Sequence, residues 1–159
     1  MRKPERLLAA LALTLMVAGA ARDALDRWID TTQMPPLLTA TGVEVVDRNG
    51  QALRVYTVAD GRWRLDVSTA QVDPDFIAML IAYEDHRFWR HNGVDFHAML
   101  RATGQALWHG QVVSGASTLT MQVARLLEEG STGQWAGKLR QIRLAMALER
   151  RLSKDQILT

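Results

Sequence analysis

The hydrophobic positions of the chain fall first into one long uninterrupted run. Residues 7–21 are uncharged and rich in Ala and Leu, and they follow the positive charges of Arg2, Lys3 and Arg6. About 20 apolar residues are needed to cross a membrane squarely, so the run predicts either a cleavable signal peptide or a tilted single-pass anchor. In both cases the positive flank stays cytoplasmic and the remainder of the chain is exported.

A linker and a hairpin are predicted next. Residues 22–42 show no long-range hydrophobic period, and Met34-Pro35-Pro36 predicts a stiff, extended stalk. Two β-prone runs follow, residues 43–46 and 52–58, and Asn49-Gly50 between them favours the positive φ angles of a hairpin turn.

Beyond the hairpin the hydrophobic residues recur with helical spacing. Asp73 can cap a helix whose first position suits Pro74. Asp95 can cap another, ended by His109-Gly110. Further helix starts are predicted at Thr118, Trp135 and Ser153. The helix from Trp135 is amphipathic, with a cationic polar side.

Composition narrows the functional classes. The chain has 159 residues, of which 48% are hydrophobic and 23% charged, so it has room for one ordinary domain and is not expected to be disordered. The formal net charge of +2 is too small to indicate nucleic-acid binding. Cysteine is absent, which excludes thiolate metal sites, and the spacing of His86, His91 and His97 matches no recognised metal-binding pattern.

The first candidate site lies around Glu84. Glu84 and Asp85 can act as a general base and a supporting carboxylate, because a partly desolvated helix end can raise a carboxyl pKa; such pairs are more often simply solvated. If the helix continued past Glu84, His91 would share its face and could orient the carboxylate or hydrogen-bond in the core. Phe88 suits either a sugar face or the core.

The second candidate site lies around Ser117 and Thr118. Their hydroxyls precede a predicted helix, where free N–H groups and the helix dipole favour an anion such as phosphate; an ordinary helix cap is the alternative. A serine nucleophile is not expected, because Gly-x-Ser-x-Gly is absent and no serine is followed three positions on by lysine. A basic set could hold a pyrophosphate or rest on anionic lipid. Its members are Arg125, Lys138, Arg140 and Arg143.

Two motifs carry a resemblance to a known family. Glu84-Asp85-x-x-Phe88-x-x-His91-x-Gly93-x-Asp95 fits the family's first motif, and the run from Ser114 to Gln122 resembles the second. Residues 43–159 thus resemble the membrane-bound peptidoglycan glycosyltransferases of glycosyltransferase family 51, as found at the front of class A penicillin-binding proteins, and among these the 1C type. Lys138 matches the lysine of the third motif, whereas Gln141 stands where the family has a second glutamate.

The resemblance implies a mainly α-helical, lysozyme-like fold with a small β-hairpin. It implies a domain over residues 43–159 that is incomplete at its carboxyl end, after a cytoplasmic stub and anchor or signal peptide over residues 1–21 and a linker over residues 22–42. The implied reaction is polymerisation of lipid II with inversion and release of undecaprenyl pyrophosphate, with Glu84 as the base. The residues implied to bind substrate are Asp85, Phe88, His91, Gly93, Ser117, Thr118, Thr120, Gln122, Arg125, Lys138 and Gln141.

The implied partners are lipid II, a lipid-linked glycan chain and the membrane, with other cell-wall synthesis proteins left open and no nucleic acid. The implied location is the inner membrane, crossed once, with the catalytic domain on the periplasmic side. No metal site is assigned, and a requirement for magnesium or manganese is left open. Two alternatives stay open: a lysozyme-like glycan hydrolase, and a truncated inactive remnant that binds lipid II or cell-wall proteins.

Overall fold

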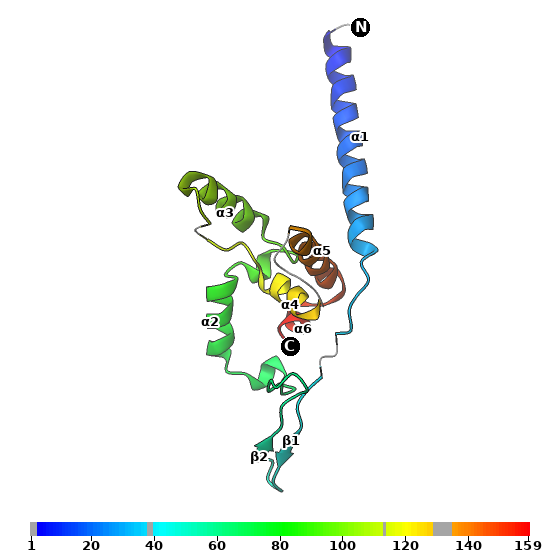
Figure 1. The fold of residues 1–159 in the computed structure, drawn as a ribbon. Coiled ribbons are helices and arrows are strands. Elements are labelled where there is room, and N and C mark those ends of the chain that lie inside the picture. The colour runs from blue at the N-terminus through cyan, green and yellow to red at the C-terminus, as the bar shows by residue number, and fades with distance from the viewer. Residues whose placement is uncertain (1–2, 38–39, 113, 129–134) are drawn as a thin grey trace.

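The computed structural model describes residues 3–37, 40–112, 114–128 and 135–159. Its elements in chain order are α1 (Lys3–Asp30), β1 (Glu44–Val46), β2 (Ala52–Val55), η1 (Thr69–Gln71), α2 (Pro74–Glu84), η2 (Phe88–Arg90), α3 (Phe96–His109), α4 (Leu119–Leu127), α5 (Trp135–Arg151) and α6 (Lys154–Leu158). α1 projects from a helical body, and the β1–β2 hairpin lies at the opposite end (Figure 1). The predicted fold class is confirmed: the chain is mainly helical, with one small hairpin and an apolar amino-terminal helix.

The helix α1 is longer than the apolar run that predicted it. Residues 22–30, expected to belong to an extended linker, continue the helix to Asp30. They contain no Gly or Pro, and Arg22 and Asp26 form an i,i+4 ion pair at 3.8 Å, which supports the added turns. By length and composition α1 could cross a membrane, a test that a signal sequence also passes. The irregular segment begins only after Thr31.

The predicted hairpin is confirmed, but its turn differs. β1 pairs antiparallel with β2, with Glu44 opposite Val55. Only Gly50 of the Asn-Gly pair has a positive φ, of 80°. The Asp47 carboxylate accepts the backbone N–H of Asn49 and of Gln51, both at 2.8 Å, and so closes the longer loop.

The predicted caps of α2 and α3 are confirmed. The Asp73 side chain accepts from the backbone N of Asp75, and Asp95 accepts from those of His97 and Ala98. Gly110 ends α3 in the left-handed conformation. The outer faces of both helices stay at the surface: Tyr83 is 93% exposed and Leu107 is 82% exposed.

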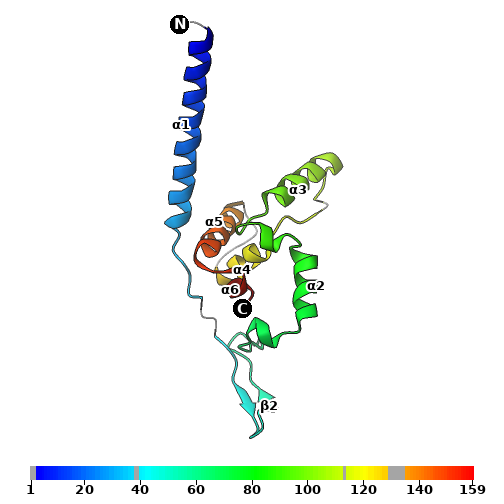
Figure 2. The same ribbon diagram turned by 180° about the vertical axis from the view of Figure 1, so that it is seen from behind.

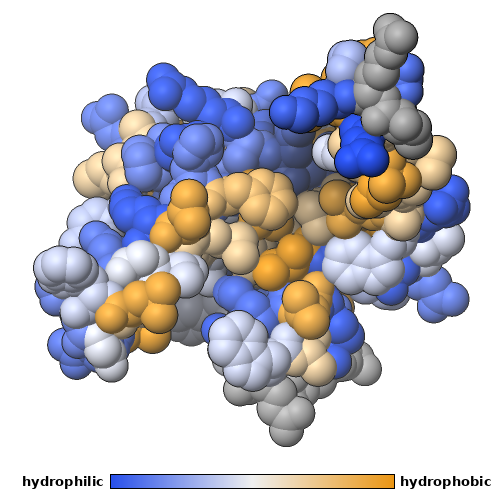
Figure 3. All heavy atoms as spheres, turned by 90° about the horizontal axis from the view of Figure 1, so that it is seen from above, coloured by the Kyte–Doolittle hydropathy of each residue, from blue (hydrophilic) through white to orange (hydrophobic). Residues whose placement is uncertain are grey.

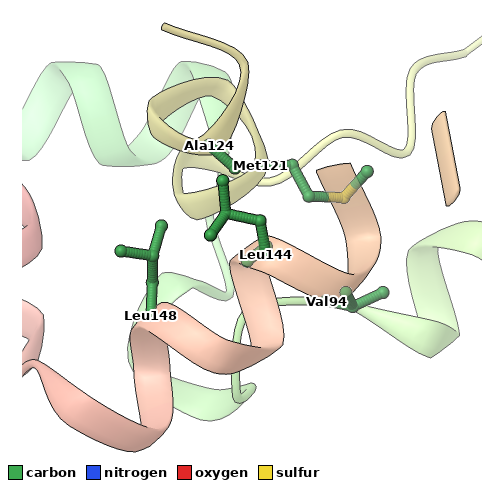
Figure 4. Packing of buried hydrophobic residues seen from close by; sticks show 6 residues of the cluster. Val94, Met121, Ala124, Leu144 and Leu148 are labelled. Carbon is green, nitrogen blue, oxygen red and sulfur yellow. The ribbon is translucent and has the colours of Figure 1, made fainter. Parts of the chain in front are cut away.

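The main core lies between α4 and α5 (Figure 4). It is an apolar cluster of Val94, Met121, Ala124, Leu144, Ala145 and Leu148. Met121 and Ala124 are three positions apart on α4, while Leu144 and Leu148 are four apart on α5, so each pair shares one helix face. A second cluster joins Phe88, Leu119 and Ile157.

One glycine brings the loop after η2 directly onto α5. Gly93 has a φ of 88°, and a Cβ built there would lie 2.5 Å from the backbone oxygen of Ala145. No other residue type fits so close to a helix backbone. The contact fixes the loop that carries His91. The two opposite views show α1 and α3 on opposite sides of α5 (Figures 1 and 2).

Candidate active site

Glu84 stands at the exposed carboxyl end of α2. Gln122 of α4 donates from Nε2 to Glu84 Oε2 at 2.9 Å, which joins two residues far apart in the chain. The amide fixes the carboxylate while leaving it open to solvent. An exposed, oriented carboxylate of this kind can take a proton from an incoming hydroxyl.

Asp85 points the other way, into the interior. Its oxygens accept from His91 Nε2 at 2.9 and 3.0 Å, and Oδ2 also accepts the backbone N–H of Leu119 at 3.0 Å. His91 does not share a face with Glu84, because α2 ends at Glu84 and the backbone of Asp85 leaves the helical conformation; the alternative, that His91 hydrogen-bonds in the interior, holds. The pair instead ties the end of α2 to the start of α4.

Thr118 is a buried cap. Its hydroxyl accepts the N–H of Met121 at 3.1 Å and donates to the Gly93 carbonyl at 2.6 Å. Together with the Leu119 N–H that Asp85 binds, this engages two amides of the first turn of α4 within the protein. The helix-cap interpretation holds, and these two amides are not free to bind a phosphate.

The cations of the site lie next to Ser117. Lys138 of α5 donates from Nζ to Ser117 Oγ at 2.7 Å. Desolvation of its ammonium, aided by the neighbouring charge of Arg125, lowers the pKa of Lys138 from the ordinary value of 10.5. Binding of an anion at such a site is favourable, because the anion reduces the repulsion between the two cations.

A hollow of about 270 Å³ brings these groups together; it is lined by Ser117, Met121, Gln122, Arg125, Lys138 and Gln141. Gln122 is thus shared: it lines this hollow and holds the Glu84 carboxylate. Ser117 is shared too, since it also lines a smaller recess beside Glu84. A candidate base and two cations consequently border two adjacent hollows that share Ser117.

A network of polar side chains joins α4, α5 and α6 next to the site. Glu149 accepts from the Thr120 hydroxyl at 2.6 Å and from Lys154 Nζ at 2.5 Å. Lys154 also donates to the His91 carbonyl at 2.8 Å and lies 4.3 Å from the centre of the Phe88 ring. The sequence alone assigned no role to Glu149 or Lys154, although both lie within residues 43–159, which carry the resemblance.

The predicted site residues therefore separate into two groups. Those that border the two hollows with exposed or partly exposed side chains are Glu84, Ser117, Gln122, Arg125 and Lys138, and the buried Gln141 amide also lines the larger one. The others are buried, and they are Asp85, Phe88, His91, Gly93, Thr118 and Thr120. Of these, Asp85 and Thr118 also line the smaller recess beside Glu84. For Phe88 the core interpretation holds, since the side chain is completely buried.

The predicted basic set does not act as one cluster. Arg143 donates to the Trp28 carbonyl and to the Thr31 hydroxyl at the end of α1. It lines, with Arg140, a different hollow of about 730 Å³ between the segment after α1 and α4 and α5. Of the two possibilities left open for this set, a pyrophosphate site shared with Lys138 is not supported for Arg140 and Arg143, because they lie beside the segment after α1 and not beside Ser117.

Metal-binding side chains do not gather at the site. Within the described ranges, no group of three His, Asp or Glu side chains is placed to hold a metal ion. Gln141 supplies an amide where a carboxylate ligand would be needed.

Known proteins with similar sequences carry the same domain. The sequence profile of a family described as "Transglycosylase" matches residues 49–159. Penicillin-binding protein 1C of Escherichia coli K12 is 47% identical over 115 residues, which cover 72% of this chain and 15% of that protein. Penicillin-binding protein 1A of the same organism is 32% identical over 158 residues, or 96% of this chain and 18% of that protein.

Penicillin-binding protein 1A of Pseudomonas aeruginosa is 39% identical over 95 residues, or 60% of this chain and 12% of that protein. The chain spans less than a fifth of the length of these relatives. The matches confirm the predicted resemblance to class A penicillin-binding proteins of the 1C type, and with it the enzyme class and the lysozyme-like fold. The chain belongs to the transglycosylase family of peptidoglycan glycosyltransferases.

Proposed function

We propose that this chain polymerises lipid II into glycan strands. The observation that carries the proposal is the shared position of Gln122, which holds the Glu84 carboxylate and also lines the hollow of Arg125 and Lys138. A base for the attacking hydroxyl and cations for the leaving group are thus adjacent, as transfer from a lipid pyrophosphate requires.

In the proposed reaction the 4-hydroxyl of the acceptor lipid II attacks the anomeric carbon of the lipid-linked glycan chain. The new oxygen–carbon bond forms as the bond from that carbon to the pyrophosphate oxygen breaks, and the configuration inverts. The proton passes to Glu84. The electron pair leaves with undecaprenyl pyrophosphate, whose charge is stabilised by Arg125 and Lys138. Ser117 and Gln141 supply hydrogen bonds beside these cations.

The buried group has a supporting function in this proposal. Asp85 and His91 hold the end of α2 against the start of α4, and Thr118 ties α4 to the Gly93 loop. These contacts fix Glu84 relative to Ser117 without touching the sugar. We therefore transfer the role of Asp85, His91, Gly93 and Thr118 from substrate contact to orientation of the residues that make that contact.

The proposed location is the inner membrane, with α1 as a single-pass anchor and the domain over residues 43–159 on the periplasmic side. The exposed apolar surface of α1 supports this, since none of its membrane-length window is buried. Figure 3 views the molecule from above, the side toward which α1 projects, and hydrophobic residues gather there among hydrophilic ones. A lipid-linked substrate would approach from that side. The membrane and lipid-linked glycans are the proposed partners.

The test is glycan polymerisation from purified lipid II by this chain in phospholipid vesicles. Glu84→Gln removes the base but keeps the size and hydrogen-bonding capacity of the side chain. We expect the rate to fall by about 100-fold to 10,000-fold, the usual contribution of a general base. Asp75→Asn, the same chemical change on the exposed first turn of α2, serves as the control and should retain full activity.

Three outcomes would contradict the proposal. Full activity of Glu84→Gln would show that another group takes the proton. Cleavage of preformed glycan strands without polymer formation would indicate a hydrolase. Binding of lipid II by the unaltered chain without any polymer would indicate an inactive remnant.

A further inference from the structure

Three arginines of α5 bind the last turns of α1, the end nearest the body of the protein. Arg143 Nε donates to the Trp28 carbonyl at 2.8 Å, and its Nη2 donates to the Thr31 hydroxyl at 3.1 Å. The guanidinium also lies over the Trp28 ring, 5.1 Å from its centre. Arg143 thus combines hydrogen bonds with a cation–π contact, which fixes the direction of approach.

The other two arginines bind the same turns of α1. Arg150 donates to the carboxylates of Asp26 and Asp30, the latter at 2.7 Å. Hydrogen bonds to these two carboxylates raise the pKa of Arg150 further above its ordinary value, so the guanidinium stays charged. Arg151 donates to the backbone oxygens of Asp30 and Thr32 at 3.1 and 3.2 Å.

These contacts add to the hydrogen bonds that Thr31 and Thr32 already donate to the last carbonyls of α1. The last carbonyls of a helix lack partners within it and carry the negative end of the helix dipole, so cations there are favourable. Ile29, which is 3% exposed, is the one residue of α1 that is buried among those described. Exposed ion pairs are individually weak, but here one segment receives donors from three side chains, a network that fixes geometry more than any single pair.

Arg143 and Arg150 lie on a different face of α5 from Lys138, so the same helix contacts both α1 and the hollow. Successive residues of a helix are turned by about 100°, so Arg143 and Arg150 share one face of α5 and Lys138 lies roughly 130° away from it. Lys138 and Gln141 line the hollow, while Arg143 and Arg150 bind α1. One rigid helix therefore carries the hollow on one side and the membrane segment on another.

We propose that Arg143, Arg150 and Arg151 are positioning residues that set the height and orientation of the Lys138 hollow relative to the membrane segment. The inference rests on the proposed function, because only a lipid-linked substrate holds its pyrophosphate at a fixed distance from the bilayer. A change at the α1–α5 contact then moves the cations away from the depth at which that pyrophosphate lies, while the hollow itself keeps its shape.

The first measurement follows the contact without using activity. The chain has no cysteine, so spin labels can be attached to single cysteines introduced at Leu25 of α1 and Leu139 of α5, both exposed. We expect a narrow distance distribution in vesicles, broadened by Arg150→Glu and narrowed again when Asp26→Arg and Asp30→Arg restore opposite charges. An unchanged distribution in Arg150→Glu would show that these arginines do not fix α1 against α5.

The second measurement links the contact to substrate presentation. For lipid II embedded in vesicles we expect Arg150→Glu to lower kcat/KM by about tenfold, mainly through KM, with recovery in the charge-restored variant. For a short-chain lipid II analogue dissolved in water the same variant should stay within about twofold. Arg27→Glu is the matched control, because it makes the same charge change at the same end of α1. Among the described residues the Arg27 side chain forms no hydrogen bond or ion pair, so this variant should behave as the unaltered chain.

Each result separates the two proposals. Equal losses on embedded and dissolved substrate, or no recovery on charge restoration, would overturn the positioning role and leave the polymerase intact. Absence of polymer from the unaltered chain would overturn the proposed function, and with it the consequence for substrate presentation. The spin-label distances would still report whether the arginines hold α1 against α5.

Discussion

Thr118 at the start of α4 and Ser117 in the hollow are consecutive residues, yet the two regions to which they belong are built in opposite ways. At the start of α4, Thr118 and Asp85 are buried, and each makes two or more hydrogen bonds to protein groups. In the hollow, Lys138 and Arg125 are partly or fully exposed cations that repel each other. The buried groups of the first region are paired with one another, whereas the two cations of the second have no carboxylate partner among the described residues that line the hollow and would be stabilised by an anion. Function is therefore expected from the second region and stability from the first.

Among the variants that test this comparison, Gly93→Ala is expected to have the largest effect on stability. The substitution adds a Cβ against the Ala145 carbonyl oxygen at a backbone angle that favours glycine, and should lower the free energy of unfolding by roughly 3 kcal/mol or more. Thermal or urea unfolding measures it. The control is Gly104→Ala within α3, where nothing lies within 4 Å and alanine should stabilise by about 0.5–1 kcal/mol. Equal stability of the two variants would show that Gly93 does not approach α5 as described.

The neighbouring hydroxyls of Thr118 and Ser117 offer the sharpest test of the comparison. Thr118→Val removes a buried group with two partners and should cost about 1–3 kcal/mol of stability. Ser117→Ala removes an exposed group that binds Lys138, so stability should change by less than about 0.5 kcal/mol. In the polymerisation assay Ser117→Ala should instead raise KM by a few-fold. If both variants lost stability equally, the division into a supporting region and a binding region would fail.

The smallest expected effect is a pH dependence of substrate affinity that arises from Lys138 in the hollow. Burial and the charge of Arg125 lower the pKa of Lys138, so the free enzyme loses this cation at a lower pH than an ordinary lysine would. A bound pyrophosphate favours the charged form, hence substrate affinity should fall as pH rises through the lowered pKa. In Lys138→Arg the side chain stays charged, and this alkaline loss should disappear from the profile of kcat/KM. The same profile in both proteins would assign the dependence to another group.

The sequence predicted those features that depend on residues close together in the chain. The caps at Asp73, Asp95, Thr118 and Ser153 are confirmed, because a cap is a contact between residues two or three positions apart. The family motifs were recognisable for the same reason: Glu84 and Ser117 stand in short runs of fixed spacing. The roles of these residues in catalysis stay proposals.

What the sequence could not give depends on packing between distant elements. Nothing local showed that α2 would end at Glu84 and send His91 to Asp85, since that pairing needs the start of α4 beside it. The sequence showed that α5 carries several cations, but not that α1 would pack beside Arg143 and Arg150 while Lys138 lines a hollow. Residues 22–30 lack an apolar period, yet their polar side chains are what α5 binds, so the helix continued where a linker was expected.

The strength of the hydrogen bond from Gln122 to Glu84 depends on whether Glu84 is protonated. An amide binds a carboxylate more strongly than the neutral acid, because the bond to the anion is assisted by charge. In the proposed reaction Glu84 takes a proton in the same step that releases the pyrophosphate, so its hydrogen bond with Gln122 would weaken in that step. The amide that borders the hollow is then least restrained when the spent carrier must depart, and it is held again once Glu84 gives up the proton. In the proposed reaction the hydrogen bond between Gln122 and Glu84 would thus weaken and re-form once with each sugar addition.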